Sequence, residues 1–224
     1  MDKRFLSILG ALVIIFIGIF IISQHSSKNS NSTASNNTAK PTAHVEGQGS
    51  KGVTLIEYGD YECPICAEFY LAVKQVAADN SQDIFFQFRN LPLTSLHPNA
   101  FSSARAAEAA SQQGKFWQMH DKLYDNQTQW ASASNPLSFF QTYAQELGLN
   151  ITKFNSDYLS SQVNNSINAD LAAFAKTNQE QATPTFFLDG KVLDNTQLID
   201  PQTGTVSVDK FNQIINQEIA SKNK

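Results

Sequence analysis

The sequence predicts an α/β domain with a helical insertion, preceded by a single N-terminal transmembrane helix and a flexible tether. Three features predict this class: an uncharged apolar run near the start, a polar segment after it, and a strand–helix–strand pattern that returns to strands after a long helical stretch. The chain has 224 residues and 42% apolar content. It is therefore long enough for one domain of ordinary size and too apolar to be wholly disordered.

The N-terminal apolar run is long enough to cross a membrane. Phe5 to Ile22 is 18 residues with no charge, which is at the lower end for a spanning helix. Lys3 and Arg4 precede it, so the positive-inside tendency places the N-terminus in the cytoplasm and the body outside. A cleaved signal peptide is the alternative, but no small-residue cleavage site follows closely. We expect residues 1–22 to be a cytoplasmic start and a transmembrane signal-anchor, which makes the protein single-pass in the cytoplasmic membrane.

The next segment, residues 23–51, is expected to be a disordered tether. Residues 23–44 hold six Ser, four Asn and three Thr, with no Leu, Ile, Val or aromatic residue, so they have no apolar face to bury. Residues 1–51 carry five basic and two acidic side chains, whereas residues 52–224 carry 11 and 18. An acidic body argues against binding to nucleic acid, which depends on clustered Lys and Arg.

Residues 52–224 form the expected α/β domain. Val53–Tyr58 has apolar residues on both alternating faces, which is typical of a central strand covered on both sides. Pro64 opens a helix to about Asp79, at a position where its missing N–H costs nothing, and Ile84–Phe88 is a second strand. Strand, helix and strand with short links predict a parallel βαβ unit.

A helical insertion is expected over about residues 95–178, where apolar residues recur at helical spacing in five segments. These segments are Pro98–Gln113, Lys115–Asn126, Pro136–Leu147, Ile151–Leu159 and the stretch that contains Ile167, Leu171 and Phe174. Strands then return at Thr185–Leu188 and Lys191–Leu193, joined by an Asp-Gly turn. Ser207 is placed to cap a final helix.

The chain has two cysteines, Cys63 and Cys66, and their spacing is the sharpest chemical signal. We expect Pro64 to fix the first helical turn and to keep Cys63 exposed at the tip of the helix N-terminus, where free backbone N–H groups and the helix dipole favour a thiolate. Cys66, one turn later, can form a disulfide with it or resolve a mixed disulfide. Half of a zinc site and coincidence are the alternatives. Zinc would need two more ligands, but two of the four histidines lie in the tether and the other two are not at paired spacing, so we expect no metal.

Three separated segments resemble the DsbA-type thioredoxin-like oxidoreductases, and the membrane-anchored bacterial forms in particular. They are LIEYGDYECPIC, RNLPLTSLHPNAFSSARAAEAASQQGKFWQMHDKLYDNQ and ATPTFFLDGK, in the order that the family has them. The resemblance extends over about residues 52–222. It implies a thioredoxin-like fold interrupted by a helical insertion, in agreement with the element order above.

The resemblance implies a role for each residue of the site. Cys63 matches the nucleophilic cysteine that faces the substrate, and Cys66 matches the buried resolving cysteine. Thr183-Pro184 matches the cis-proline loop that faces the cysteine pair. We expect this loop, together with the Pro64-Ile65 dipeptide, to bind substrate.

Two further residues bear on reactivity. Glu57 matches a family acid near the buried cysteine, and strand alternation places it on an apolar face, where burial raises the pKa of a carboxyl group. We expect it to exchange a proton with Cys66; a carboxyl that reaches solvent at the strand end is the alternative. Ile65 stands where the strongest oxidants of the family have His. We therefore expect Cys63 to be less acidic, and the pair less oxidising, than in those proteins.

These observations predict a membrane-tethered thiol:disulfide oxidoreductase that introduces disulfide bonds into secreted or surface proteins outside the cytoplasm. Its redox group would be the Cys63–Cys66 disulfide, with no other cofactor, and we expect a monomer that acts on reduced or unfolded proteins. The resemblance implies re-oxidation by a quinone-linked membrane partner of the DsbB or VKOR type. The alternatives are a reductase or isomerase in the same compartment, and a non-catalytic tethered binding module whose cysteine pair is only a clip.

Overall fold

The computed structural model describes residues 40–222, so the predicted signal-anchor and most of the predicted tether lie outside the described residues. Within these residues, five strands form one sheet in the order β1-β3-β2-β4-β5. They are β1 (His44–Glu46), β2 (Val53–Gly59), β3 (Ile84–Asn90), β4 (Thr185–Leu188) and β5 (Lys191–Val192). Strands β2 and β3 are parallel, and the other neighbours are antiparallel. The predicted βαβ unit is confirmed.

Helices follow the predicted order, with two short additions. The helical elements are α2 (Pro64–Asp79), α3 (Ala100–Ser111), α4 (Phe116–Asp125), α5 (Gln127–Trp130), α6 (Leu137–Glu146), α7 (Ile151–Tyr158), α8 (Ser161–Ala175), the 3-10 helix η1 (Asn195–Leu198) and α9 (Val208–Lys222). Both α5 and η1 are four-residue turns, too short to show a periodic pattern. Within residues 40–222, no helix is both long enough and apolar enough to cross a membrane.

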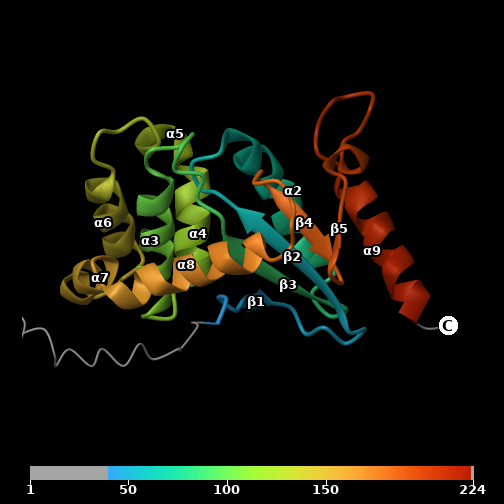
Figure 1. The fold of residues 1–224 in the computed structure, drawn as a ribbon, viewed down its shortest axis with the longest axis horizontal. Helices are drawn as coiled ribbons and strands as arrows, with labels where there is room; N and C mark the ends of the chain where they lie inside the picture. The colour runs from blue at the N-terminus through green and yellow to red at the C-terminus, as the bar shows by residue number, and fades with distance from the viewer. Residues whose placement is uncertain (1–39, 223–224) are drawn as a thin grey trace, which may run out of the picture. The chain divides into compact units, whose positions relative to one another are not determined.

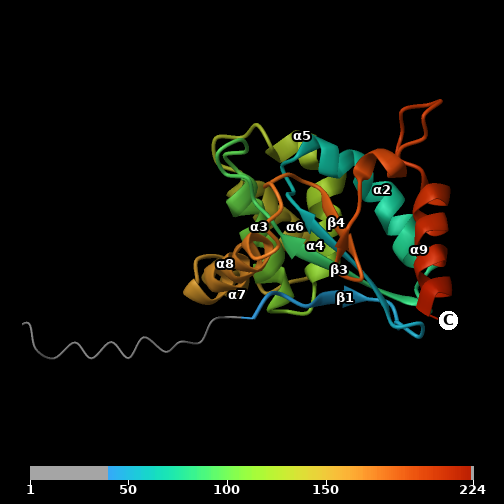
Figure 2. The same cartoon turned by 45° about the vertical axis from the view of Figure 1, so that its right-hand side comes forward.

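Helices cover the two faces of the sheet differently. Helices α2 and α9 pack on one face, over apolar side chains that include Leu55, Phe86 and Phe186. Helix α8 meets the other face through Phe174, which contacts Tyr58 edge-on. In Figure 1, α8 lies in front of the sheet and α2 behind it, and Figure 2 shows α9 alongside α2.

The insertion has a core of its own to one side of the sheet. Helices α3, α4, α6 and α7 gather there (Figure 1) around fully buried large side chains such as Trp130, Phe140 and Phe154. Helix α3 contributes mainly alanines to this core, and small side chains let neighbouring helices approach closely. The same cluster includes Cys63 and Cys66, so the insertion packs directly against the cysteine pair.

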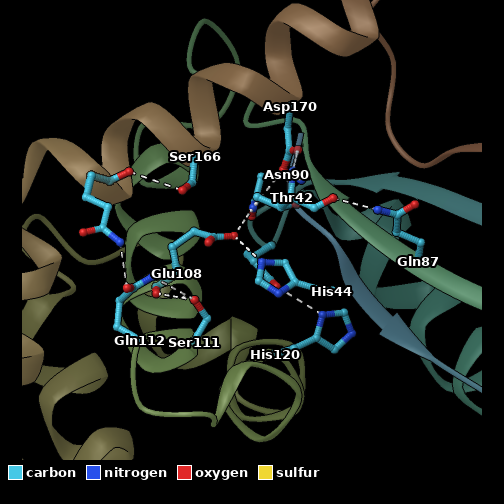
Figure 3. Close-up of polar contacts among 12 residues, drawn as sticks. Thr42, His44, Gln87, Asn90, Glu108, Ser111, Gln112, His120, Ser166 and Asp170 are labelled. Atoms are coloured by element: carbon cyan, nitrogen blue, oxygen red, sulfur yellow. Dashed lines mark hydrogen bonds and ion pairs between the residues drawn. The ribbon is translucent and has the colours of Figure 1, made fainter. Parts of the chain in front are cut away.

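The sequence prediction for residues 40–51 is wrong, because these residues are held to the domain rather than belonging to a disordered tether. Strand β1 pairs antiparallel with β3, and the backbone of residues 48–51 bonds to that of residues 81–84. The contacts that hold the segment are polar: Asp170 accepts two bonds from Thr42, both 2.7 Å, and Glu108 accepts one from His44 at 2.7 Å. Figure 3 shows this polar cluster, which the hydrophobic pattern of the sequence does not predict.

We predict that Asp170→Ala weakens the fold chiefly by releasing β1. Asp170 is fully buried and also accepts a bond from the backbone N–H of Asn90 at 3.0 Å, so its loss leaves buried donors without partners. The free energy of unfolding in urea should fall by about 3 kcal/mol, and amide exchange in β1 should accelerate most. Glu180→Ala, at an exposed acid, is the control and should change stability by less than about 0.5 kcal/mol. Equal losses in the two variants would contradict a role for Asp170 in holding β1.

Candidate active site

The cysteine pair lies where β2 leads into α2. Cys63 is the N-cap of α2 with extended backbone angles, φ −68° and ψ 121°, and Pro64 occupies the first turn as predicted. Both cysteines are free thiols. Cys66 is fully buried and Cys63 is 5% exposed, so the expectation that Cys63 is exposed at the tip is wrong. The loop before β4 lies against Cys63, because its Sγ is 3.4 Å from the carbonyl oxygen of Thr183.

The two thiols have opposite acidities. A hydrogen bond from the Cys66 side chain lowers the pKa of Cys63 to about 6, against the opposing effect of burial. The Thr183 side chain and the backbone N–H groups of Cys66 and Ile65 lower it further. Burial first, and then the bond to Cys63, raise the pKa of Cys66 well above its usual value. At neutral pH the pair is therefore a thiolate at Cys63 beside a protonated Cys66.

The peptide bond between Thr183 and Pro184 is cis, which confirms the prediction from the family resemblance. The side-chain amide of Asn195 holds this loop by donating to the Pro184 carbonyl at 2.8 Å. The Thr183 hydroxyl oxygen is buried and has no hydrogen-bond partner within residues 40–222 while Cys63 is a thiol. It therefore remains available to donate to the thiolate.

Glu57 is 2% exposed on central strand β2, opposite Phe88 of β3 and Phe186 of β4. Burial, and then the nearby charge of Cys63, raise the pKa of Glu57 to about 8. The predicted apolar environment is confirmed, and the alternative in which Glu57 reaches solvent is wrong. A carboxyl group with this pKa can both donate and accept a proton near neutral pH.

A cavity of about 60 Å³ connects Glu57 to polar side chains between α2 and α4. Its lining includes Lys74 and Asp121, which form an ion pair at 2.8 Å, and His120. Burial lowers the pKa of His120 to about 3, so this histidine is neutral. The volume is enough for a few water molecules, each of which needs roughly 10–15 Å³. A proton that leaves Glu57 thus has a polar space to enter.

Sequence reasoning missed the side chains that hold the loop before Cys63. The Gln127 amide donates to the carbonyls of Tyr61 and Cys63, at 2.8 and 2.9 Å, from the insertion. Asp60 accepts from the backbone N–H of Leu93 at 3.0 Å and pairs with His97 at 2.8 Å. Gln127 lies in the unpredicted helix α5, and no local pattern signals these long-range bonds. Within residues 40–222, no group of three or more His, Cys, Asp or Glu side chains could hold a metal ion.

Comparison with known proteins supports the fold. A family model described as Thioredoxin matches residues 39–215. Solved structures with a similar fold include BdbD from Bacillus subtilis, with a TM-score of 0.67, 21% identity, and coverage of 81% of this chain and 97% of that one. Another is alpha-DsbA1 from Wolbachia pipientis, with a TM-score of 0.63, 18% identity, and coverage of 82% and 94%. At these identities the likeness is one of fold.

Curated relatives that are more identical to this chain than these structures are longer proteins named as Na(+)/H(+) antiporters. A protein named Na(+)/H(+) antiporter NhaA 1 from Mycolicibacterium gilvum is 38% identical over 152 residues. The match covers 66% of this chain and 23% of the relative. The similar region is therefore less than a quarter of the relative's length.

We predict that Thr183→Val raises the pKa of Cys63 by about one unit, because the thiolate loses a hydroxyl donor. The pH dependence of alkylation by iodoacetamide measures this pKa, and Cys66 should stay unreactive. Thr185→Val is the matched control, since the Thr185 hydroxyl donates to the Ala182 carbonyl at 2.6 Å and not to sulfur. The same pKa in both variants would mean that Thr183 does not donate to the thiolate.

We predict that Glu57→Gln removes a pH dependence from the stability of the reduced protein. The pKa of Glu57 is about 8 when folded, against 4.5 as its ordinary value. The contribution of protonated Glu57 to the free energy of unfolding is therefore fully present below pH 4.5 and is lost as the pH rises through 8. Between pH 4 and pH 8 the unfolding free energy of the parent protein, relative to that of the variant, should fall by about 4 kcal/mol. Urea unfolding at the two pH values measures the difference, and parallel curves would rule out a buried, protonated Glu57.

Proposed function

Since this chain belongs to the thioredoxin family, we propose that it is a thiol–disulfide oxidoreductase and that it works as an oxidase that introduces disulfide bonds into secreted or surface proteins. The observation that carries the proposal is the opposite acidity of the two cysteines. A Cys63 thiolate is a good leaving group, so it favours release of an oxidised substrate. A buried Cys66 thiol disfavours attack by outside reagents.

The reaction follows from these properties. A substrate thiolate attacks Cys63 of the disulfide, a mixed disulfide forms, and the Cys63–Cys66 bond breaks to leave charge on Cys66. Cys66 takes up a proton, for which Glu57 is the nearby source. A second substrate thiolate then attacks the substrate sulfur of the mixed disulfide and displaces Cys63 as a thiolate. Two electrons pass from the substrate dithiol to the cysteine pair, which ends reduced.

The substrate would lie beside the cis-proline loop. Thr183 contacts the Cys63 sulfur, and Ile65 is 45% exposed next to it, so an extended peptide could lie along the loop and against an apolar side chain. The predicted signal-anchor supports an extracytoplasmic location. It also supports re-oxidation by a quinone-linked membrane partner of the DsbB or VKOR type, because the tether would keep the two together.

A second candidate differs in its substrate. The relatives named as Na(+)/H(+) antiporters carry a region 35–38% identical to this chain, a higher identity than that of the solved structures cited above. The cysteine pair would then exchange disulfides with cysteines of a membrane transport protein rather than with secreted proteins. The same residues would carry out the same chemistry.

The deciding experiment traps both the redox state and the substrates. Thiol trapping in intact cells should find the Cys63–Cys66 disulfide as the resting form. Cys66→Ala should accumulate mixed disulfides through Cys63, which mass spectrometry identifies as secreted proteins or as a transporter. A resting dithiol would indicate a reductase or isomerase instead. Function that survives Cys63→Ser would favour the binding module.

A further inference from the structure

The face of the sheet opposite Glu57 is only partly covered. Side chains alternate along β2, so Ile56 and Tyr58 point away from the face on which Glu57 lies. Helix α8 covers the Tyr58 end through Phe174, but Val192 of β5 is 45% exposed. In Figure 1, α8 crosses in front of β2 and β3, whereas β4 and β5 extend beyond it.

A cavity of about 410 Å³ lies on this open face, between the sheet and the C-terminal part of α8. Ile56, Phe187 and Val192 form an apolar wall on the sheet, and Ala173 and Thr177 line the other side. The volume is within the range of about 300–1,000 Å³ that small-molecule sites have. The cavity is separate from the cysteine site, because its walls come from the other side of β2.

Arg89 gives this cavity a positive charge. Its guanidinium lies over the Tyr58 ring at 5.5 Å and donates to the Tyr58 hydroxyl at 2.7 Å and to the Gln87 side-chain oxygen at 3.3 Å. Both acceptors are neutral, and the buried Nε has no hydrogen-bond partner within residues 40–222. A half-buried guanidinium with neutral partners and apolar walls favours an anion with two acceptor oxygens.

We propose that this cavity binds a small apolar monocarboxylate, with its carboxylate on Arg89 and its hydrocarbon body against Ile56, Phe187 and Val192. Among the described residues, the lining of this cavity includes one cation, Arg89, which suits a single negative charge. The acidic body of the chain disfavours ligands that carry several negative charges. The inference is independent of the reaction at Cys63.

The test compares two probes of the same shape, 4-phenylbutanoate and 4-phenylbutan-1-ol, by titration calorimetry on the full chain. The carboxylate should bind at least 10-fold more tightly than the alcohol. Arg89→Gln should weaken carboxylate binding at least 10-fold. Arg105→Gln is the matched control: Arg105 also donates to a neutral oxygen, that of Asn164 at 2.7 Å, and lies over aromatic rings, but it is outside this cavity. The affinity of the Arg105→Gln variant for the carboxylate should stay within about twofold of the parent value.

A second pair of variants covers the case in which Arg89→Gln does not fold. Val192→Asp and Val192→Asn change an exposed position of a two-residue edge strand, and only the first adds a negative charge. Val192→Asp should weaken carboxylate binding at least fivefold more than Val192→Asn, with no such difference for the alcohol. Equal affinities for the two probes, or an unchanged affinity in Arg89→Gln, would overturn the proposal.

Discussion

The burial of one carboxyl group on the central strand is the constraint on which the rest of the site depends. Glu57 lies between the aromatic side chains of two neighbouring strands, so its ionisation is costly and its pKa rises to about 8. The charge that the site holds most readily is instead the thiolate of Cys63 at the start of α2, which Cys66 stabilises by a hydrogen bond. As the pH rises, Cys63, Glu57 and Cys66 therefore lose their protons in that order.

The insertion takes part in the site and is more than an addition to the sheet. Gln127 and His97 reach back from it to the loop that presents Cys63, and its apolar core includes both cysteines. A thioredoxin-like sheet supplies the strand and helix that position the pair. The insertion supplies hydrogen bonds that fix the loop before Cys63, so the position of Cys63 depends on contacts from both parts.

The elements that could be predicted from the sequence are those that residues close together in the chain determine. Strand β2, helix α2 and the turn at Asp189-Gly190, where both residues have positive φ, follow from apolar alternation, proline position and turn chemistry. The environment of Glu57 followed from strand alternation, and the cis bond before Pro184 from the family resemblance. Strand β1 could not be predicted, because Asp170 and Glu108 hold it across 128 and 64 positions of sequence. Gln127 was missed for the same reason.

The distance along the chain between Thr42 and Asp170 also constrains the order in which a growing chain can assemble. A chain that emerges N-terminus first exposes Thr42, just before β1, long before its partner Asp170 on α8 exists, a separation of 128 residues. The unit of β2, α2 and β3 can pair as soon as residue 90 has emerged, so the helix that Cys63 caps and that carries Cys66 forms early. Thr183 arrives almost a hundred residues later, and α8 only shortly before it. During synthesis, Cys63 therefore spends an interval in which Cys66 and the first turn of α2 alone favour its thiolate, before the contact with Thr183 exists.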